Sequence, residues 1–190
     1  MTPPLASLSL LPLACSLLAL GCGSPSHAAP APTSASAPKA APTSPAASAL
    51  AEAAATLQGT WTCRGSVFGP EGPSPSTVSL KTTRVLGDSW LRTDFAVASG
   101  QYPYEFTSYR TFDATSKTWL SLIVDNLGGH SVSQSSDGVT WTGTSSSRMG
   151  ELTIRDSERV PAPDELQLLG EYSLDGGQSY RTGYELSCDR

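Results

Sequence analysis

The feature of this chain that most constrains its fold is the alternating run at residues 57–67, which reads LQGTWTCRGSV. Every second side chain of a β-strand points to the same face, so this run predicts a strand with one face in a core and one in water. The last run of the chain, residues 178–190, alternates in the same way and is its predicted neighbour. Pairing of the first and last strands would close the sheet between them into a barrel.

Eight further alternating segments lie between these two runs, and turn-forming residues such as Asp137-Gly138 separate them. Short strands at a spacing of about ten residues, joined by tight turns, predict an all-β, up-and-down antiparallel β-barrel of about ten strands. One long loop is expected at residues 68–76, which contain three prolines. A two-sheet sandwich is the alternative, and it usually needs longer crossover connections.

Composition divides the chain into three parts. Residues 1–21 are predicted to be a signal peptide, because their apolar stretch is too short and too interrupted to span a membrane. Residues 22–56 are rich in Ala, Pro and Ser and are predicted to form a disordered linker. The linker is expected to end in a short helix, because Ser44-Pro45 is typical of an N-cap and a first helical position. Residues 57–190 hold all four Trp and all six Tyr and form the predicted barrel domain.

The sequence ALGC at residues 19–22 resembles the bacterial lipobox, in which cleavage before a cysteine leaves a thiol that becomes lipidated. It departs from that pattern at Ala19, where Leu is usual, and in having no Lys or Arg directly after Met1. The resemblance implies an exported lipoprotein of a bacterial cell envelope, anchored through Cys22 in the outer membrane, with its domain in the periplasm or on the surface. An ordinary signal peptide with a spare thiol is the alternative.

The motif Gly59-Thr60-Trp61 matches the G-x-W that begins the first strand in the lipocalins and the wider calycin group. With the run VLGDSWL at residues 85–91 and the turn at Asp113, the domain is similar to a bacterial family of lipocalin-like barrels of unknown function. In calycins the Trp closes one end of the barrel, and an Arg of the last strand stacks on it. The resemblance implies these roles for Trp61 and Arg190.

Cys63 and Cys188 are the only cysteines in residues 57–190, and an exported chain favours a disulfide between them over two free thiols. Directly opposed residues of an antiparallel pair have a constant sum of residue numbers. The register that the disulfide sets places Trp61 opposite Arg190 and Val67 opposite Tyr184. The predicted bond and the implied stack are therefore consistent with each other.

The barrel interior is the candidate binding site. Calycin barrels often bind small apolar or amphipathic molecules, and alternation places several aromatic side chains inside. The candidate ligand-binding residues are Phe95, Phe106, Trp119, Tyr172 and Tyr184. The alternative is an envelope structural or interaction module in which these side chains only fill a core.

Several function classes find no support in the sequence. The net charge is −5 with scattered Lys and Arg, so nucleic acid is not an expected partner. His130 is predicted to be a turn residue rather than a haem or metal ligand, because a metal site needs several such ligands close together. The acidic pairs Asp156/Glu158 and Asp164/Glu165 are predicted to be solvated charges at strand edges and turns. We therefore expect a monomer that is not an enzyme and holds no metal or cofactor.

Overall fold

The computed structural model describes residues 44–101, 103–148 and 150–190. The predicted signal peptide, Cys22 and the linker up to residue 43 lie outside these residues. In the described part the chain forms one helix and ten strands. They are α1 (Pro45–Leu57), β1 (Gly59–Gly69), β2 (Gly72–Val85), β3 (Trp90–Ser99), β4 (Glu105–Asp113), β5 (Thr118–Asp125), β6 (His130–Ser135), β7 (Thr140–Ser147), β8 (Gly150–Ala162), β9 (Glu165–Ser173) and β10 (Arg181–Asp189).

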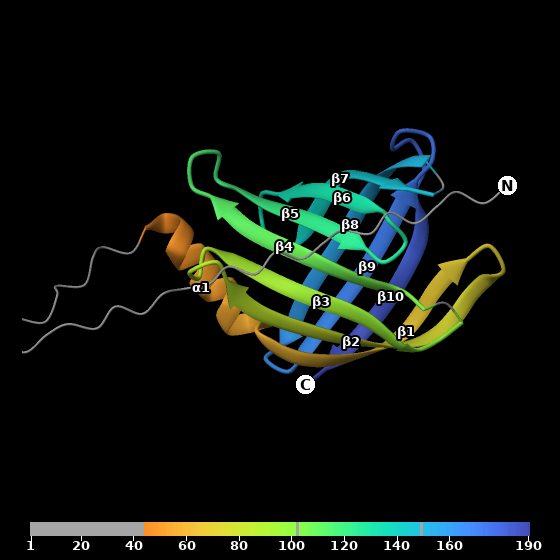
Figure 1. Ribbon diagram of the computed structural model, residues 1–190, viewed down its shortest axis with the longest axis horizontal. Helices are drawn as coiled ribbons and strands as arrows, with labels where there is room; N and C mark the ends of the chain where they lie inside the picture. The colour runs from red at the N-terminus through yellow and green to blue at the C-terminus, as the bar shows by residue number, and fades with distance from the viewer. Residues whose placement is uncertain (1–43, 102, 149) are drawn as a thin grey trace, which may run out of the picture. The chain divides into compact units, whose positions relative to one another are not determined.

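The ten strands form one closed antiparallel barrel (Figure 1). Each strand pairs with its neighbours in the sequence, and β1 pairs with β10. The predicted all-β, up-and-down antiparallel barrel of ten strands is therefore confirmed. The register of the closing pair is also the predicted one, with Cys63 opposite Cys188 and Val67 opposite Tyr184.

The predicted long loop at residues 68–76 is wrong, because this segment is a hairpin. β1 continues to Gly69, and β2 already begins at Gly72, which is the partner of Gly69. Pro73 and Pro75 lie in the first part of β2, which pairs with β1 but not yet with β3. Proline has no N–H for a second neighbour, so it is tolerated on such a free edge. The prolines therefore mark a strand edge here and not a loop.

Helix α1 covers the end of the barrel at which β2 ends and β3 begins (Figure 1). Ser44 is its N-cap and Pro45 its first residue, as predicted. Leu50 and Ala54 are buried, and they pack with Leu91 and Trp119 in a small cluster of their own. No helix in the described part of the chain has the length and apolar character needed to cross a membrane.

Trp61 and Arg190 lie together under the C-terminal end of α1. The indole Nε1 of Trp61 donates a hydrogen bond to the carbonyl of Leu57 at 3.0 Å. The guanidinium carbon of Arg190 lies 4.1 Å from the centroid of the Trp61 ring, and its Nη2 donates to the carbonyl of Thr56. Carbonyls at the C-terminal end of a helix carry partial negative charge, which favours a cation there. The stack therefore ties the last residue of the chain to both the helix and the first strand.

The barrel interior has an apolar half and a polar half. The buried core residues of the apolar half come from β1, β2, β3, β9 and β10, and they are Trp61, Cys63, Val78, Leu80, Phe95, Leu166, Leu186 and Cys188. In the polar half, the buried side chains of β4, β5 and β6 are all serines, namely Ser108, Ser121, Ser131, Ser133 and Ser135. Buried hydroxyl groups need hydrogen-bond partners, so apolar packing alone does not explain this half.

We predict that the Cys63–Cys188 disulfide contributes more to stability than the Arg190 stack does. The bond joins residues 125 positions apart, and the chain-entropy model gives about 5 kcal/mol for closing such a loop. An exposed cation–π contact contributes about 0.5–1 kcal/mol. The Cys63→Ala/Cys188→Ala variant should therefore unfold at a much lower urea concentration than Arg190→Ala.

Dithiothreitol provides the control for this prediction. It should lower the urea midpoint of the native protein and leave that of the Cys63→Ala/Cys188→Ala variant unchanged. An Arg190→Ala variant that loses more stability than the variant without the disulfide would contradict the ranking.

Candidate functional site

A buried ion pair crosses the barrel interior from β4 to β8. Arg110 Nη1 and Nη2 donate to Oε1 and Oε2 of Glu158 at 2.8 and 3.0 Å, and each side chain is 15% exposed. Burial acts to lower the pKa of Arg110, but the attraction of Glu158 outweighs burial and raises the pKa. A twofold contact of this kind is the strongest form of guanidinium–carboxylate pair. Arg110 is therefore held in its charged state.

Two hydrogen-bond donors beside the Arg110–Glu158 pair have no acceptor in the described part of the chain. Arg110 Nε and Trp141 Nε1 are buried, and no group of the described residues accepts a hydrogen bond from either. Trp141 is 3% exposed, and its ring centroid lies 4.5 Å from Cζ of Arg110. A buried donor left without a partner costs about 1–3 kcal/mol. The two donors therefore mark a place where an acceptor atom of a ligand could bind.

A second buried carboxylate, Asp156, lies next to the pair on β8. The Tyr184 hydroxyl on β10 donates to Asp156 Oδ1 at 3.0 Å, reaching across β9. Gly170 on β9 permits this approach, because a Cβ there would lie 2.0 Å from Cε1 of Tyr184. Burial, with the Asp156 carboxylate, raises the pKa of Tyr184, so the phenol remains a hydrogen-bond donor.

The pKa of Asp156 is shifted toward neutrality. Its value is raised to about 6, and burial is the largest cause; the negative charges of Glu158 and Glu171 also act to raise it. The hydrogen bond from Tyr184 and the charge of Arg110 act in the opposite direction. A carboxyl group that gains and loses its proton near neutral pH therefore faces the barrel interior.

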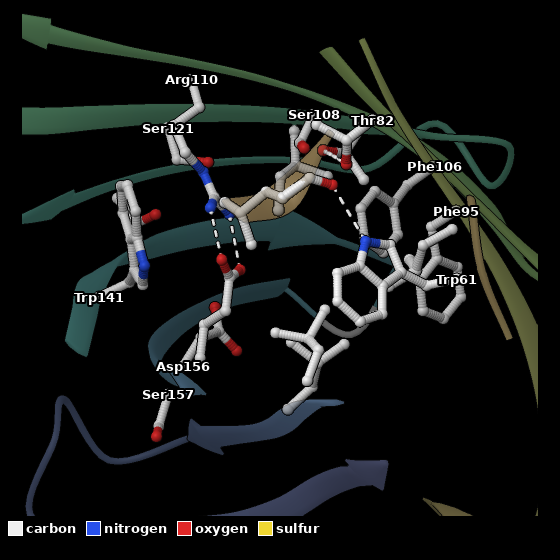
Figure 2. Close-up of a pocket in the computed structure, with 18 of the residues that line it drawn as sticks. Trp61, Thr82, Phe95, Phe106, Ser108, Arg110, Ser121, Trp141, Asp156 and Ser157 are labelled. Atoms are coloured by element: carbon white, nitrogen blue, oxygen red, sulfur yellow. Dashed lines mark hydrogen bonds and ion pairs between the residues drawn. The ribbon is translucent and has the colours of Figure 1, made fainter. Parts of the chain in front are cut away.

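These groups line a cavity of about 80 Å³ (Figure 2). Figure 2 shows an aromatic wall on one side of the cavity, formed by Trp61, Phe95 and Phe106, and a charged wall on the other, formed by Arg110, Trp141 and Asp156. The rings of Phe95 and Phe106 are stacked, with centroids 4.4 Å apart. Apolar surface with a few convergent polar groups is the usual composition of a small-molecule site.

The structure brings together part of the predicted ligand-binding set. Phe95, Phe106 and Tyr184 line the cavity. Trp119 packs instead against the helix cluster at the end of the barrel beneath α1, and Tyr172 lies near the end of β9 at the opposite end. Neither of these two lines the cavity. Alternation indicates which face of a strand a residue occupies, but it does not show at what height in the barrel the cavity forms.

The prediction that Asp156 and Glu158 are solvated charges is wrong, because both side chains line the cavity. Leu152, Ile154 and Val160 lie on the same face of β8, two residues apart from one another or from these acids. These apolar neighbours were the available sequence signal that Asp156 and Glu158 face the interior. Arg110 had no comparable signal, since its partner comes from a strand 48 residues away.

The other polar candidates lie on the surface. His130 is exposed at the start of β6, and Asp164 and Glu165 are exposed around the turn between β8 and β9. Within residues 44–101, 103–148 and 150–190, no group of three or more His, Cys, Asp and Glu side chains is placed to hold a metal ion.

Comparisons with known proteins are sparse. No family model matches the chain, and no curated protein matches it. One similar solved structure is described as "Structure of S-type Phycobiliprotein Lyase CPES from Guillardia theta". It is 12% identical, with a TM-score of 0.48, and the match covers 74% of this chain and 92% of the other.

The expectation that this chain is not an enzyme is contradicted by that comparison, because the similar chain is described as a lyase. At 12% identity the likeness carries no reaction over to this chain. Within the chain, Asp156 is the kind of group that acid–base chemistry uses, since its pKa lies near neutrality beside a cavity.

We predict that Asp156 makes the folded state less stable as pH rises. Its pKa is about 6 in the folded protein, against an ordinary value of 3.8. Between these values the folded state holds a proton that the unfolded state has lost, so stability falls as pH increases. The stabilising contribution is complete below about pH 4 and disappears as pH rises through about 6; it amounts to about 3 kcal/mol at most.

Asp156→Asn tests this prediction, because the amide resembles the protonated acid and does not titrate. Urea unfolding of both proteins at about pH 4.5 and pH 7.5 should show the variant gaining stability relative to the native protein at the higher pH. The difference between the two proteins cancels the titration of all other carboxyl groups. Equal differences at the two pH values would show that Asp156 has no raised pKa.

Proposed function

We propose that the barrel binds one small amphipathic molecule in the cavity between Trp61 and Trp141. The observation that carries this proposal is the pair of buried donors without a protein acceptor, Arg110 Nε and Trp141 Nε1. A core that served stability alone would gain little from two unpaired donors or from the Arg110–Glu158 ion pair, since replacing a buried ion pair by apolar residues is often neutral or stabilising. Charged groups retained around a cavity therefore support a role in binding.

The two walls suggest how the molecule would be oriented. Its apolar part would lie against Phe95 and Phe106, and its polar part would lie against Arg110, Trp141 and Asp156 (Figure 2). A volume of about 80 Å³ is well below the roughly 300–1,000 Å³ of pockets that hold drug-sized ligands. We therefore infer a compact ligand and not a long lipid chain.

Filling the cavity should abolish binding without unfolding the barrel. Ser121 is buried, lies opposite Arg110 in the sheet and lines the cavity, so Ser121→Leu would place two more heavy atoms in the space for the ligand. Native mass spectrometry of protein purified from its own host should show a bound small molecule for the native chain. We expect the bound mass to be lost in Ser121→Leu.

Ser79→Leu is the matched control, because it makes the same exchange at an exposed position of β2. This variant should retain the bound mass. A native protein without any bound molecule that also binds none of the small probes named below would contradict the proposed function.

We also propose that the chain is an exported lipoprotein anchored through Cys22 in a bacterial envelope. The lipobox-like sequence ALGC at residues 19–22 supports this proposal. The Cys63–Cys188 disulfide supports export independently, because disulfides persist in oxidising compartments and are rare in the cytosol.

Metabolic labelling with palmitate tests the anchor. The native chain should incorporate label and sediment with membranes, and Cys22→Ala should lose both properties. Cys15→Ala is the control, because this cysteine lies inside the apolar stretch that cleavage would remove. Label retained by Cys22→Ala would exclude Cys22 as the anchor.

A further inference from the structure

We propose that the ligand is a small amine whose ammonium group lies at Asp156 and whose apolar body lies against Phe95 and Phe106. This inference rests on the proposed binding function and specifies its ligand class. The charged side chains that line the cavity are Arg110, Glu158 and Asp156, which are two acids and one base. The cavity therefore offers a surplus of negative charge when all three are ionised.

The base is already neutralised by one of the acids. Both terminal nitrogens of Arg110 donate to the two carboxylate oxygens of Glu158, which leaves neither charge free to bind a second ion. Asp156 has no such partner. Among the described residues, its side chain receives a hydrogen bond from the neutral hydroxyl of Tyr184. A neutral donor stabilises a carboxylate but does not cancel its charge.

The groups around Asp156 reinforce this surplus. Glu158 lies two residues after Asp156 on β8, and Glu171 lies on the adjacent strand β9. The negative charge of each acts to raise the pKa of Asp156. Glu171 is paired with Arg155, whose Nε lies 2.7 Å from its carboxylate. Arg110 favours the Asp156 charge, but burial outweighs it. The remaining neighbours on other strands, Tyr104 on the segment before β4 and Tyr184 on β10, are phenols with raised pKa values.

An ammonium ion is the ligand group that would neutralise the charge of Asp156. A carboxylate or phosphate would add a third negative charge to the cavity, and its burial without a counter-ion is strongly unfavourable. A neutral alcohol could accept from Arg110 Nε and Trp141 Nε1 but would leave Asp156 uncompensated. An amine compensates Asp156, and a hydroxyl or carbonyl oxygen on the same molecule could still accept from those two donors.

Three probes with the same ring separate the alternatives. Benzylamine is a cation at about pH 7.5, benzyl alcohol is neutral and benzoate is an anion. Each is titrated into the native protein while the indole N–H signals are followed by NMR. We expect benzylamine to bind about tenfold more tightly than either of the others. Equal or tighter binding of benzyl alcohol or benzoate would overturn the amine proposal and leave the binding function standing. If no probe binds, the amine proposal fails, and the binding function fails with it when the native protein also carries no bound molecule.

Asp156→Asn identifies the residue responsible. It should weaken benzylamine binding about tenfold and leave benzyl alcohol binding unchanged, which also shows that the cavity is intact. Glu185→Gln removes an acid from the exposed face of β10 and should change neither affinity. An Asp156→Asn variant that still prefers benzylamine would overturn the assignment.

The pH dependence gives a second readout. Benzylamine should bind the native protein less tightly as pH falls below about 6, because Asp156 then becomes protonated. The affinity of Asp156→Asn should stay constant over the same range. Identical pH profiles for the two proteins would overturn the role of Asp156.

Discussion

The pairing of the first strand with the last is the constraint on which the rest of this structure depends. β1 and β10 bring the two ends of the barrel domain together, and the disulfide between Cys63 and Cys188 holds their register. Closure leaves every strand paired on both sides along most of its length. It also shuts half of the side chains away from bulk water, so each polar group inside must find its partner inside.

That requirement applies most strongly to the charged side chains of the interior. The ion pair of Arg110 and Glu158 joins walls that are distant around the barrel, and taking such charges out of water costs several kcal/mol for each ion before their attraction offsets it. The apolar half formed by β1, β2, β3, β9 and β10 shows that this chain can pack a conventional core. The Arg110–Glu158 pair is therefore better explained by the proposed binding of a ligand than by stability.

Helix α1 completes the closed end through its C-terminal carbonyls. Leu57 and Thr56 accept hydrogen bonds from Trp61 and Arg190, so helix, first strand and chain terminus meet at one place. The aromatic wall of the cavity includes Trp61 from this same junction (Figure 2). The shape of the cavity consequently depends on the docking of the helix as well as on the barrel.

The sequence alone determined the architecture, because a barrel strand repeats every two residues and a turn has a local chemistry. Alternation gave the strands, the pair Cys63 and Cys188 gave the register of closure, and Ser44-Pro45 gave the start of the helix. Of the residues that line the cavity, alternation predicted Phe95, Phe106 and Tyr184. Only the tertiary structure placed the charged groups beside them, Arg110 on β4 and Asp156 on β8. Their burial, their pairing and the pKa of Asp156 arise from groups far away in the chain, and no local pattern records such distances.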